Sequence, residues 1–432
     1  MISKYSRIFL LFLLFAAPIF VLAQDHGHDH DDHSDQDHSE HTQEAHGENH
    51  SHEGDHHAGC GCDHHAEEKE YNPTPDAFHH IADANAYHVV GDIYVPLPCM
   101  LYAPESGWTF MMSNKFDYGH NHGTGKKAIN GYVLNHGEIM RVSDSSFPMN
   151  EEVEIDCITH GEGDSYVVNY KGTCYALDYK STVDGGLFGG GITSFYDFSI
   201  TKNVFTMLLA FLLVFLIFRA VAKGYKAREG NAPKGIQSLV EPIFLFIRDE
   251  VAIPFLGHKY ERFLPFLMSI FFFILALNLV GQIPFFPGSA NVTGALAVTG
   301  ALAIITFILV NINGNGHYWQ HIFWMPGVPV FVKPLLAFIE ILSLFIKPLT
   351  LMLRLAANIT AGHIVIFIFV ALIFIFGNAG QSMVGTGIGT LLSVPLTLFM
   401  MTIELIVAFV QAFVFTILTA SYIGAAIEEH HH

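Results

Sequence analysis

Charge is scarce in this 432-residue sequence, and basic charge is the scarcest: 14% of the residues are charged, with 21 Lys and Arg against 40 Asp and Glu. The shortage is uneven, because residues 1–194 hold 9 basic and 30 acidic side chains, whereas residues 195–432 hold 12 and 10. Such an acidic front half excludes a nucleic-acid-binding surface, which needs clustered Lys and Arg against phosphate. The two halves therefore face different solvents.

Cysteine is absent from the second half of the chain. The sequence has five cysteines, all in the first 174 residues: Cys60, Cys62, Cys99, Cys157 and Cys174. An oxidising compartment would permit a bridge, of which Cys157 to Cys174 is the simplest. Because the number is odd, the pairing stays undetermined.

Apolar residues dominate the second half instead. The chain is 51% hydrophobic with a mean hydropathy of +0.37, too apolar for an ordinary soluble domain. Residues 195–429 therefore predict an all-α polytopic membrane domain, in which an amphipathic helix at about 235–257 lies on the cytoplasmic face. A helix needs about 20 residues to cross about 30 Å, so five segments qualify as transmembrane helices, the last two long and tilted. These are residues 203–222, 263–286, 291–312, 334–377 and 386–425.

The amino end has the features of an export signal. Lys4 and Arg7 precede an apolar run that ends in Val21-Leu22-Ala23, which predicts a signal peptide over residues 1–23. The alternative is an uncleaved first membrane helix, and in either case the residues after this run are exported. Basic residues gather just after the first span, between 219 and 234, and the positive-inside rule places them in the cytoplasm. We therefore expect a bacterial inner-membrane protein with its N-terminus in the periplasm and its C-terminus in the cytoplasm.

The exported part divides in two. Residues 24–70 are a low-complexity, disordered tail of His, Asp, Glu, Gly and Ser, whose imidazoles and carboxylates favour weak binding of divalent metals. An equally good interpretation is a solvated tail with incidental metal affinity. Residues 71–194 alternate β-branched or aromatic runs with turn residues, which predicts a small β-rich segment, and a glycine cluster at 185–191 then leads to the membrane. The densest candidate ligands in the tail are His26, His28, His30, His56 and His57.

Polar residues recur at seven-residue spacing in the last two apolar segments, and seven residues are two helical turns. The segment 334–377 is twice as long as a span, so it must tilt, bend at Pro348 or run along the surface. A charge at mid-bilayer is costly, so we expect both stripes to face each other or a hydrated path. One stripe holds Glu340, Ser343, Lys347, Thr350, Arg354 and Asn358; the other holds Thr397, Glu404 and Gln411.

Some of these residues have plainer explanations. Glu340 and Lys347 would equally form an ion pair at the cytoplasmic end, and Asn278 and Gln411 would equally hold helices together by hydrogen bonds. Arg354 has no acid within a helical turn to neutralise it. A single His363 would usually be structural, but Glu404 falls at similar depth on the next helix, which favours a functional pair.

The run from Leu351 to His363 closely resembles the signature of subunit a of the membrane sector of F-type ATP synthases. Four further segments agree in order and spacing, so the resemblance covers about residues 195–429. They are 218–223, 278–284, Glu340 through Lys347-Pro348, and 410–415.

This resemblance implies a non-catalytic stator subunit, without a cofactor, that carries protons through two half-channels against a rotating ring of c subunits. It implies the rest of the complex as partners, including the b subunits of the peripheral stalk and the lipid bilayer. Arg354 would be the essential arginine that faces the ring carboxylate and blocks proton leakage, since arginine stays protonated. His363, Glu404, Gln411 and Asn278 would line the entry half-channel on the exported side.

Two departures from the common bacterial pattern stand out. Many relatives have Glu at the position of His363 and His at the position of Glu404, and an exchange that keeps one acid and one imidazole supports direct proximity. Gly281 replaces an acidic residue of some relatives.

The coupling ion, proton or sodium, depends on the ring subunit, which is a separate chain. The alternative function is a secondary divalent-metal transporter with a metal-capturing tail, although a fixed Arg354 would repel a divalent cation.

Overall fold

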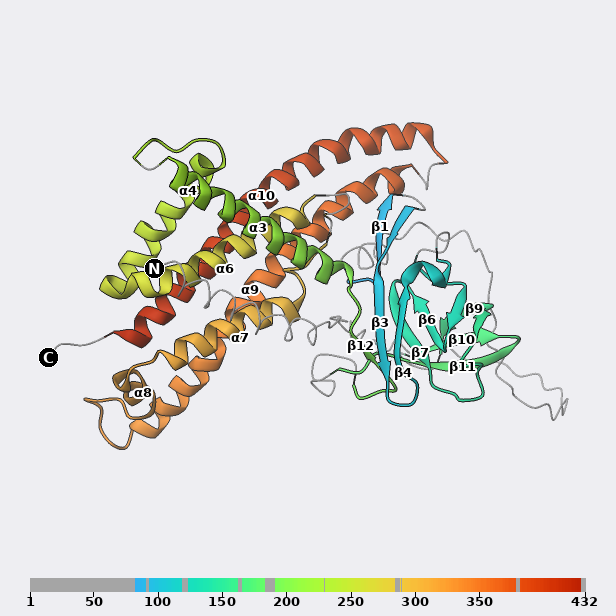
Figure 1. Ribbon diagram of the computed structural model, residues 1–432, viewed down its shortest axis with the longest axis horizontal. Coiled ribbons are helices and arrows are strands. Elements are labelled where there is room, and N and C mark those ends of the chain that lie inside the picture. The colour runs from blue at the N-terminus through green and yellow to red at the C-terminus, as the bar shows by residue number, and fades with distance from the viewer. Residues whose placement is uncertain are drawn as a thin grey trace, which may run out of the picture.

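The computed structural model describes residues 82–428, apart from 91–92, 119–122, 162–164, 183–190, 229, 284–287, 289 and 378–380. A β-rich module comes first in the chain, and a larger bundle of helices follows (Figure 1). The expected signal peptide over residues 1–23, the tail over 24–70 and its five candidate metal ligands lie outside the described residues.

Short antiparallel strands build the module, as the alternation of β-branched and turn residues predicts. A seven-stranded sheet has the order β8-β5-β6-β7-β11-β10-β9, a three-stranded sheet has the order β12-β3-β4, and β1 pairs with β2. The strands are β1 (Ala86–Val90), β2 (Ile93–Pro96), β3 (Pro98–Ala103), β4 (Gly107–Met112), β5 (Lys127–Ile129), β6 (Tyr132–Asn135), β7 (Glu138–Val142), β8 (Glu152–Glu154), β9 (Cys157–His160), β10 (Tyr166–Tyr170), β11 (Thr173–Asp178) and β12 (Tyr196–Asp197).

The seven-stranded sheet buries both of its faces. Side chains alternate between faces along a strand, so in β6 Tyr132 and Leu134 enter one core while Val133 enters another. The first core is closed on its other side by Cys99 and Leu101 of the three-stranded sheet. Burial raises the pKa of the Cys99 thiol to about 12, so this thiol is an unreactive part of the core.

The simplest disulfide expected from the sequence, Cys157 to Cys174, is wrong. Both residues lie opposite Asn169 of β10, one on β9 and the other on β11, so a whole strand separates them. Neighbouring strands are about 4.8 Å apart, which puts the two cysteines roughly 10 Å apart, beyond the reach of a disulfide. Cys174 is free and exposed, whereas Cys157 is disulfide-bonded.

The helical half begins four residues after β12. Its elements are α3 (Lys202–Ala227), α4 (Ile236–Ile247), a π-helical turn (Arg248–Ala252), α5 (Ile253–Leu256), α6 (Tyr260–Gly281), α7 (Leu296–Ile312), α8 (Gly316–Phe323), α9 (Lys333–Phe376) and α10 (Met383–Ile427). The predicted amphipathic helix at 235–257 corresponds to α4 through α5, and its position on a membrane surface stays a prediction.

Four helical runs of the described chain are long and apolar enough to cross a membrane: α3, the run from Ile236 to Gly281, α9 and α10. A fifth span exists if α7 and α8, which meet at 105°, count as one broken span. The expected helix at 291–312 begins late, because residues 291–295 form a turn before α7. The chain is therefore a multi-pass membrane protein with four or five candidate spans.

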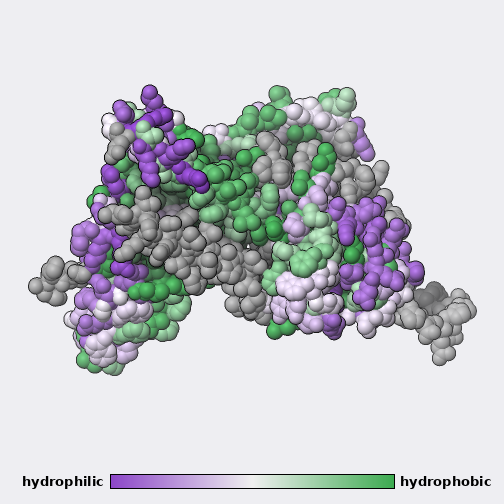
Figure 2. Space-filling model, in the orientation of Figure 1, coloured by the Kyte–Doolittle hydropathy of each residue, from purple (hydrophilic) through white to green (hydrophobic). Residues whose placement is uncertain are grey.

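Helices α9 and α10 run through Pro348 and Pro395 as single helices of 44 and 45 residues. At 1.5 Å per residue each is about 66 Å long, roughly twice the hydrocarbon thickness of a bilayer, so both must tilt steeply. Apolar residues cover much of the visible surface of the helical half, as a lipid-facing protein requires (Figure 2). Hydrophilic residues gather at the ends of α3 and α4 that lie away from the module.

The module is joined directly to the first turn of α3. The backbone N–H of Lys202 donates to the carbonyl of Ala84 at 2.8 Å, and that of Asn203 donates to the Asp83 carboxylate at 2.9 Å. The rings of Tyr87 and Phe205 meet edge to face at 6.3 Å. These contacts identify one end of the helical half, called here the module end.

Candidate functional site

Helices α9 and α10 bring a histidine and a glutamate together inside the apolar bundle. The Nε2 atom of His363 lies 3.6 Å from Oε1 of Glu404, and the two side chains are 19% and 4% exposed. A buried carboxylate is costly unless it is paired or protonated, and this imidazole is the titratable partner within reach. The arrangement is therefore able to hold and exchange a proton.

The residue before His363 is a glycine for a steric reason. A Cβ atom placed on Gly362 would lie 3.1 Å from Oε1 and 3.3 Å from the carboxyl carbon of Glu404. These distances are tighter than ordinary van der Waals contacts, so a side chain at 362 would press on the carboxylate. The absence of that side chain lets Glu404 lie directly against α9 beside His363.

Asn278 of α6 continues the polar cluster toward the bundle centre. Its side-chain amide donates to the Ala408 carbonyl at 3.1 Å, and its side-chain oxygen accepts a hydrogen bond from the Thr293 hydroxyl at 2.8 Å. Ala408 lies one turn after Glu404 and one turn before Gln411, which is also buried. Asn278 thus contacts α10 between its two buried polar residues, Glu404 and Gln411.

The turn at 291–295 supplies residues that the sequence interpretation missed. Asn291 donates from its side-chain amide to the Thr360 hydroxyl at 3.1 Å, and Thr360 lies one turn before His363 on α9. The Asn291 side-chain oxygen is buried without a hydrogen-bond partner among the described residues. A polar Asn-Val-Thr sequence at the start of an apolar segment is the signal that could have identified them, since such residues favour turns.

The His363–Glu404 pair lies toward the module end. Lys202, at the first turn of α3, is buried and close enough to His363 for their charges to interact. The Lys202 backbone is bonded to the module, so the module, this lysine and the pair follow one another in space.

Arg354 has the opposite environment. It is exposed, and it forms no ion pair or hydrogen bond with any residue that the structure describes. Asn358 and two small residues, Ala357 and Ala361, are exposed on the same side of α9. Small residues allow close approach of another helix, so this surface of α9 suits a helical partner that carries a compensating charge.

The two polar stripes expected from the sequence therefore do not face each other along their whole length. On α10, Glu404 and Gln411 point inward; on α9, Leu351, Leu355 and Ile359 are buried, and Arg354 lies on the exposed side. The polar residues of the two helices meet where His363 contacts Glu404. Near Arg354, the α10 residue close enough for electrostatic interaction is Tyr422.

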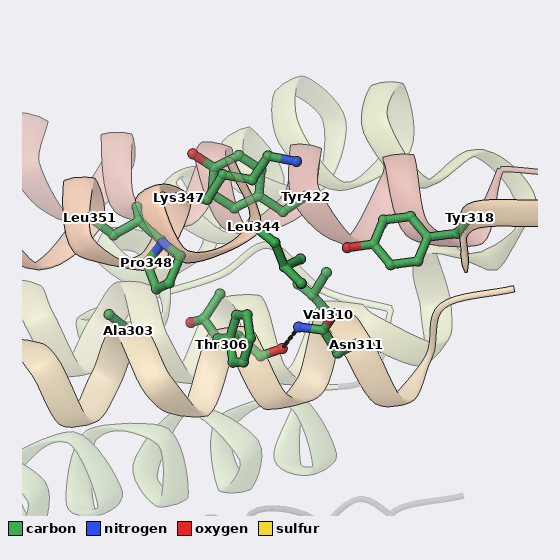
Figure 3. A pocket seen from close by; sticks show the side chains of 11 residues that line it. Ala303, Thr306, Val310, Asn311, Tyr318, Leu344, Lys347, Pro348, Leu351 and Tyr422 are labelled. Atoms are coloured by element: carbon green, nitrogen blue, oxygen red, sulfur yellow. Dashed lines mark hydrogen bonds between the residues drawn. The ribbon is translucent and has the colours of Figure 1, made fainter. Parts of the chain in front are cut away.

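A cavity lined by Lys347, Pro348 and Leu351 of α9 lies on the other side of Arg354 along this helix from His363. Figure 3 shows the residues that line it. It is partly open to solvent, with about 330 Å³ of empty space between α7, α8, α9 and α10, and it is lined by Thr306, Asn311, Tyr318, Lys347 and Tyr422 among others. The Thr306 hydroxyl and the Asn311 side-chain oxygen are buried without hydrogen-bond partners among the described residues. The Lys347 ammonium lies 5.6 Å from the centre of the Tyr422 ring.

Two other predicted residues lie on this part of α9. The Thr350 hydroxyl donates to the Ile346 carbonyl at 2.9 Å, one turn back on its own helix. Glu340 is half-buried and close enough to Tyr318 of α8 for electrostatic interaction. Neither residue contacts the His363–Glu404 pair. In the part of the chain that the structure describes, no group of three or more His, Cys, Asp or Glu side chains is placed to hold a metal ion.

Comparison with known proteins gives two matches to family models. Residues 204–424 match the family described as ATP synthase A chain, and residues 77–160 match a domain of unknown function, DUF8433. A protein named ATP synthase subunit a from Chloroherpeton thalassium is 40% identical over 250 residues, which are 55% of this chain and 69% of that protein.

Two further proteins with the same name are similar. The one from Myxococcus xanthus is 39% identical over 243 residues, covering 55% of this chain and 75% of that protein. The one from Anaeromyxobacter dehalogenans is 36% identical over 287 residues, covering 63% of this chain and 70% of that protein. The match to the ATP synthase A chain family lies within the helical half.

Proposed function

The chain belongs to the ATP synthase subunit a family, a non-catalytic component of the membrane sector, and from this membership we propose that it is the stator subunit that couples proton flow to rotation. In this proposal the chain lies in a bacterial inner membrane beside a ring of c subunits, and the b subunits of the peripheral stalk hold it. The observation that carries the proposal is the environment of Arg354, an exposed cation in an apolar helix without a partner among the described residues.

The chemistry of Arg354 fits a passing carboxylate. A guanidinium stays protonated in an apolar environment, attracts an ionised carboxylate strongly there, and cannot relay a proton. Because the exposed surface of α9 beside it carries Ala357 and Ala361, a ring helix is able to approach closely. Arg354 would therefore keep the ring carboxylate ionised as it passes and separate the two proton paths.

The entry path would run through the polar cluster at the module end. Protons from the exported side would reach His363 and Glu404, whose imidazole and carboxyl groups can each accept and donate a proton. Asn278, Gln411, Asn291 and Thr360 would hold water and orient the pair, since they supply amide and hydroxyl groups on the helices and the turn that adjoin it. From there a proton would pass to the ring carboxylate after it leaves Arg354.

The exit path would use the cavity between α7, α9 and α10. This cavity lies on the opposite side of Arg354 along α9, toward Glu340 and away from the module. Its buried hydroxyl and amide oxygen without protein partners are groups that water would satisfy. A proton could then cross only by riding on the ring between the two offset paths, and this requirement couples flow to rotation.

The test is proton transport by the assembled membrane sector in vesicles, with wild-type chain and with Arg354→Ala. An imposed potential should drive proton flux through the wild type, measured as quenching of a pH-sensitive dye, and the variant should lose coupled flux or leak. Normal ATP-driven pumping by Arg354→Ala would refute the proposal. Measurements with and without sodium separate the two coupling ions, and zinc uptake without proton flux would instead favour a metal transporter.

A further inference from the structure

The three-stranded sheet of the module has one unusual face. Along β3, the residues Cys99, Leu101 and Ala103 enter the core, so the alternate residues point to the other side of the sheet. An antiparallel sheet with one face on a core usually carries polar residues on the other. Here the other face is apolar.

The register of the sheet defines this face residue by residue. Tyr102 pairs with Trp108 on β4 and with Tyr196 on β12, and the next pairs follow at two-residue steps. Beyond β12 the chain continues beside β3, because Phe198 donates to the Met100 carbonyl and Ile200 to the Pro98 carbonyl. Three rows of three residues result, without a charged side chain: Tyr196, Tyr102 and Trp108; Phe198, Met100 and Phe110; Ile200, Pro98 and Met112. We call these nine residues the aromatic face.

Ring contacts hold the aromatic face together, but its outer side is open. The Trp108 ring lies 5.2 Å from that of Tyr102, 5.8 Å from that of Phe110 and 5.4 Å from that of Phe198. Trp108 and Phe110 are nevertheless 54% and 67% exposed. Exposed apolar patches of this kind mark an interaction surface.

The position of the aromatic face limits what can cover it. Ile200, in the last row, precedes the start of α3 at Lys202 by two residues, and α3 exposes Leu208, Leu212 and Leu216 in its apolar span. Rows are about 7 Å apart and strands about 4.8 Å apart, so the whole face lies within about 17 Å of Ile200. Strands β3 and β4 run crosswise to the helices, on the side of the module toward them (Figure 1), while hydrophilic residues gather on the far side (Figure 2).

From this placement we propose that the aromatic face binds the lipid bilayer itself, lying in the headgroup and upper acyl region of the leaflet on the module side. Trp and Tyr are enriched at this depth because their rings combine apolar area with a polar group. The absence of charge removes the desolvation cost of contact with acyl chains. The exposed leucines of α3 belong to the apolar span that begins two residues after this face, which is why lipid is the partner and not a separate protein.

Trp108 provides the test, because the described chain has few other indoles to remove. In the full complex carrying Trp319→Phe and Trp324→Phe, Trp108 is the reporter, and retained ATP-driven pumping shows that the complex is intact. Replacing part of the phosphatidylcholine in the vesicles with acyl-brominated phosphatidylcholine should lower its emission by about twofold or more. Acrylamide in the aqueous phase should quench it weakly.

The control moves the reporter to the far sheet. The control variant combines Cys174→Trp, at an exposed position on β11, with Trp108→Phe. The indole emission of this variant should be insensitive to brominated lipid and quenched by acrylamide. Adding Phe110→Glu to the Trp108 reporter should reduce quenching by brominated lipid, whereas Cys174→Glu should not.

Two results would overturn the lipid assignment. If acrylamide quenches Trp108 and brominated lipid does not, the aromatic face lies free in water. If neither reagent quenches Trp108, a protein covers the face, either another subunit or a second copy of this chain. Both results leave the proton-transport proposal unaffected, because that proposal rests on α9 and α10.

Discussion

Helices α9 and α10 are nearly equal in length and equally apolar, yet they direct their polar residues differently. Glu404 and Gln411 of α10 are buried, and Glu404 meets its partner His363 inside the chain. Arg354 of α9 is exposed and has no ion-pair partner in the described chain. The buried carboxylate of α10 therefore has its partner within this chain, whereas the guanidinium of α9 needs a partner from another chain.

This difference predicts the largest effect at Arg354. Arg354→Lys keeps the positive charge but loses the planar guanidinium and gains a proton that can be lost in an apolar environment. ATP-driven pumping should fall by about 100-fold or more, the size of effect seen when a fixed electrostatic group is removed. The control is Arg262→Lys on α6, where Arg262 already donates to Asn313 within the chain, and pumping should stay near wild type. Equal loss of pumping in both variants would contradict the claim that Arg354 and Arg262 differ in their environments.

The internal pair should tolerate an exchange that the exposed arginine cannot. His363→Ala and Glu404→Ala should each reduce proton flux by about tenfold, or about 1.4 kcal/mol in the barrier, because each removes one titratable group of the pair. The double exchange, His363→Glu with Glu404→His, should retain several times more flux than either single variant. If all three lose flux equally, direct exchange between the two side chains is not the basis of transport.

A substitution at Gly362 tests the contact between α9 and α10. Gly362→Ala places a methyl group against the Glu404 carboxylate and should move it from His363 by a few tenths of an ångström, lowering flux by about threefold. Gly387→Ala on α10 is the matched control, since a Cβ there meets nothing within 4 Å. Unchanged flux in Gly362→Ala, with normal assembly, would mean that the pair does not need this spacing.

The smallest effect is expected at Asn278, which acts through hydrogen bonds rather than charge. Asn278→Ala removes bonds to Ala408 and Thr293 and should destabilise the bundle by about 1–2 kcal/mol, lowering the Tm of the solubilised complex by roughly 3 °C. Asn313→Ala, which loses bonds to Leu309 and Arg262 at the edge of the bundle, tests whether depth matters. A larger loss of flux for Asn278→Ala than for His363→Ala would reverse the expected order.

The sequence shows which polar residues lie in apolar helices, but it does not show which way they point. Seven-residue spacing places Glu340, Lys347 and Arg354 near one helical face, whereas the orientation of that face follows from the burial of Leu351, Leu355 and Ile359 against the other helices. The facing arrangement of the two stripes that the spacing predicts is therefore not found at Arg354, whose outward position is the one that the resemblance to the family implies.

The remaining features could not be predicted because they depend on contacts between residues far apart in the sequence. The β-rich nature of the module was visible in its alternating residues. The order of the strands was not visible in the sequence, so the position of β10 between the strands of Cys157 and Cys174 could not be foreseen. The turn at Asn291 was hidden for a related reason, since its hydrogen bond to Thr360 spans 69 positions of the chain.

The junction between the module and α3 has a mechanical consequence. The first turn of α3 is bonded to the module at Ala84 and Asp83, and Tyr87 packs on Phe205. A lone transmembrane helix is able to spin about its axis and slide along it, but this one can do neither without moving the folded module that is bonded to it. The module therefore adds frictional resistance to both motions and holds α3 in one position relative to the membrane surface.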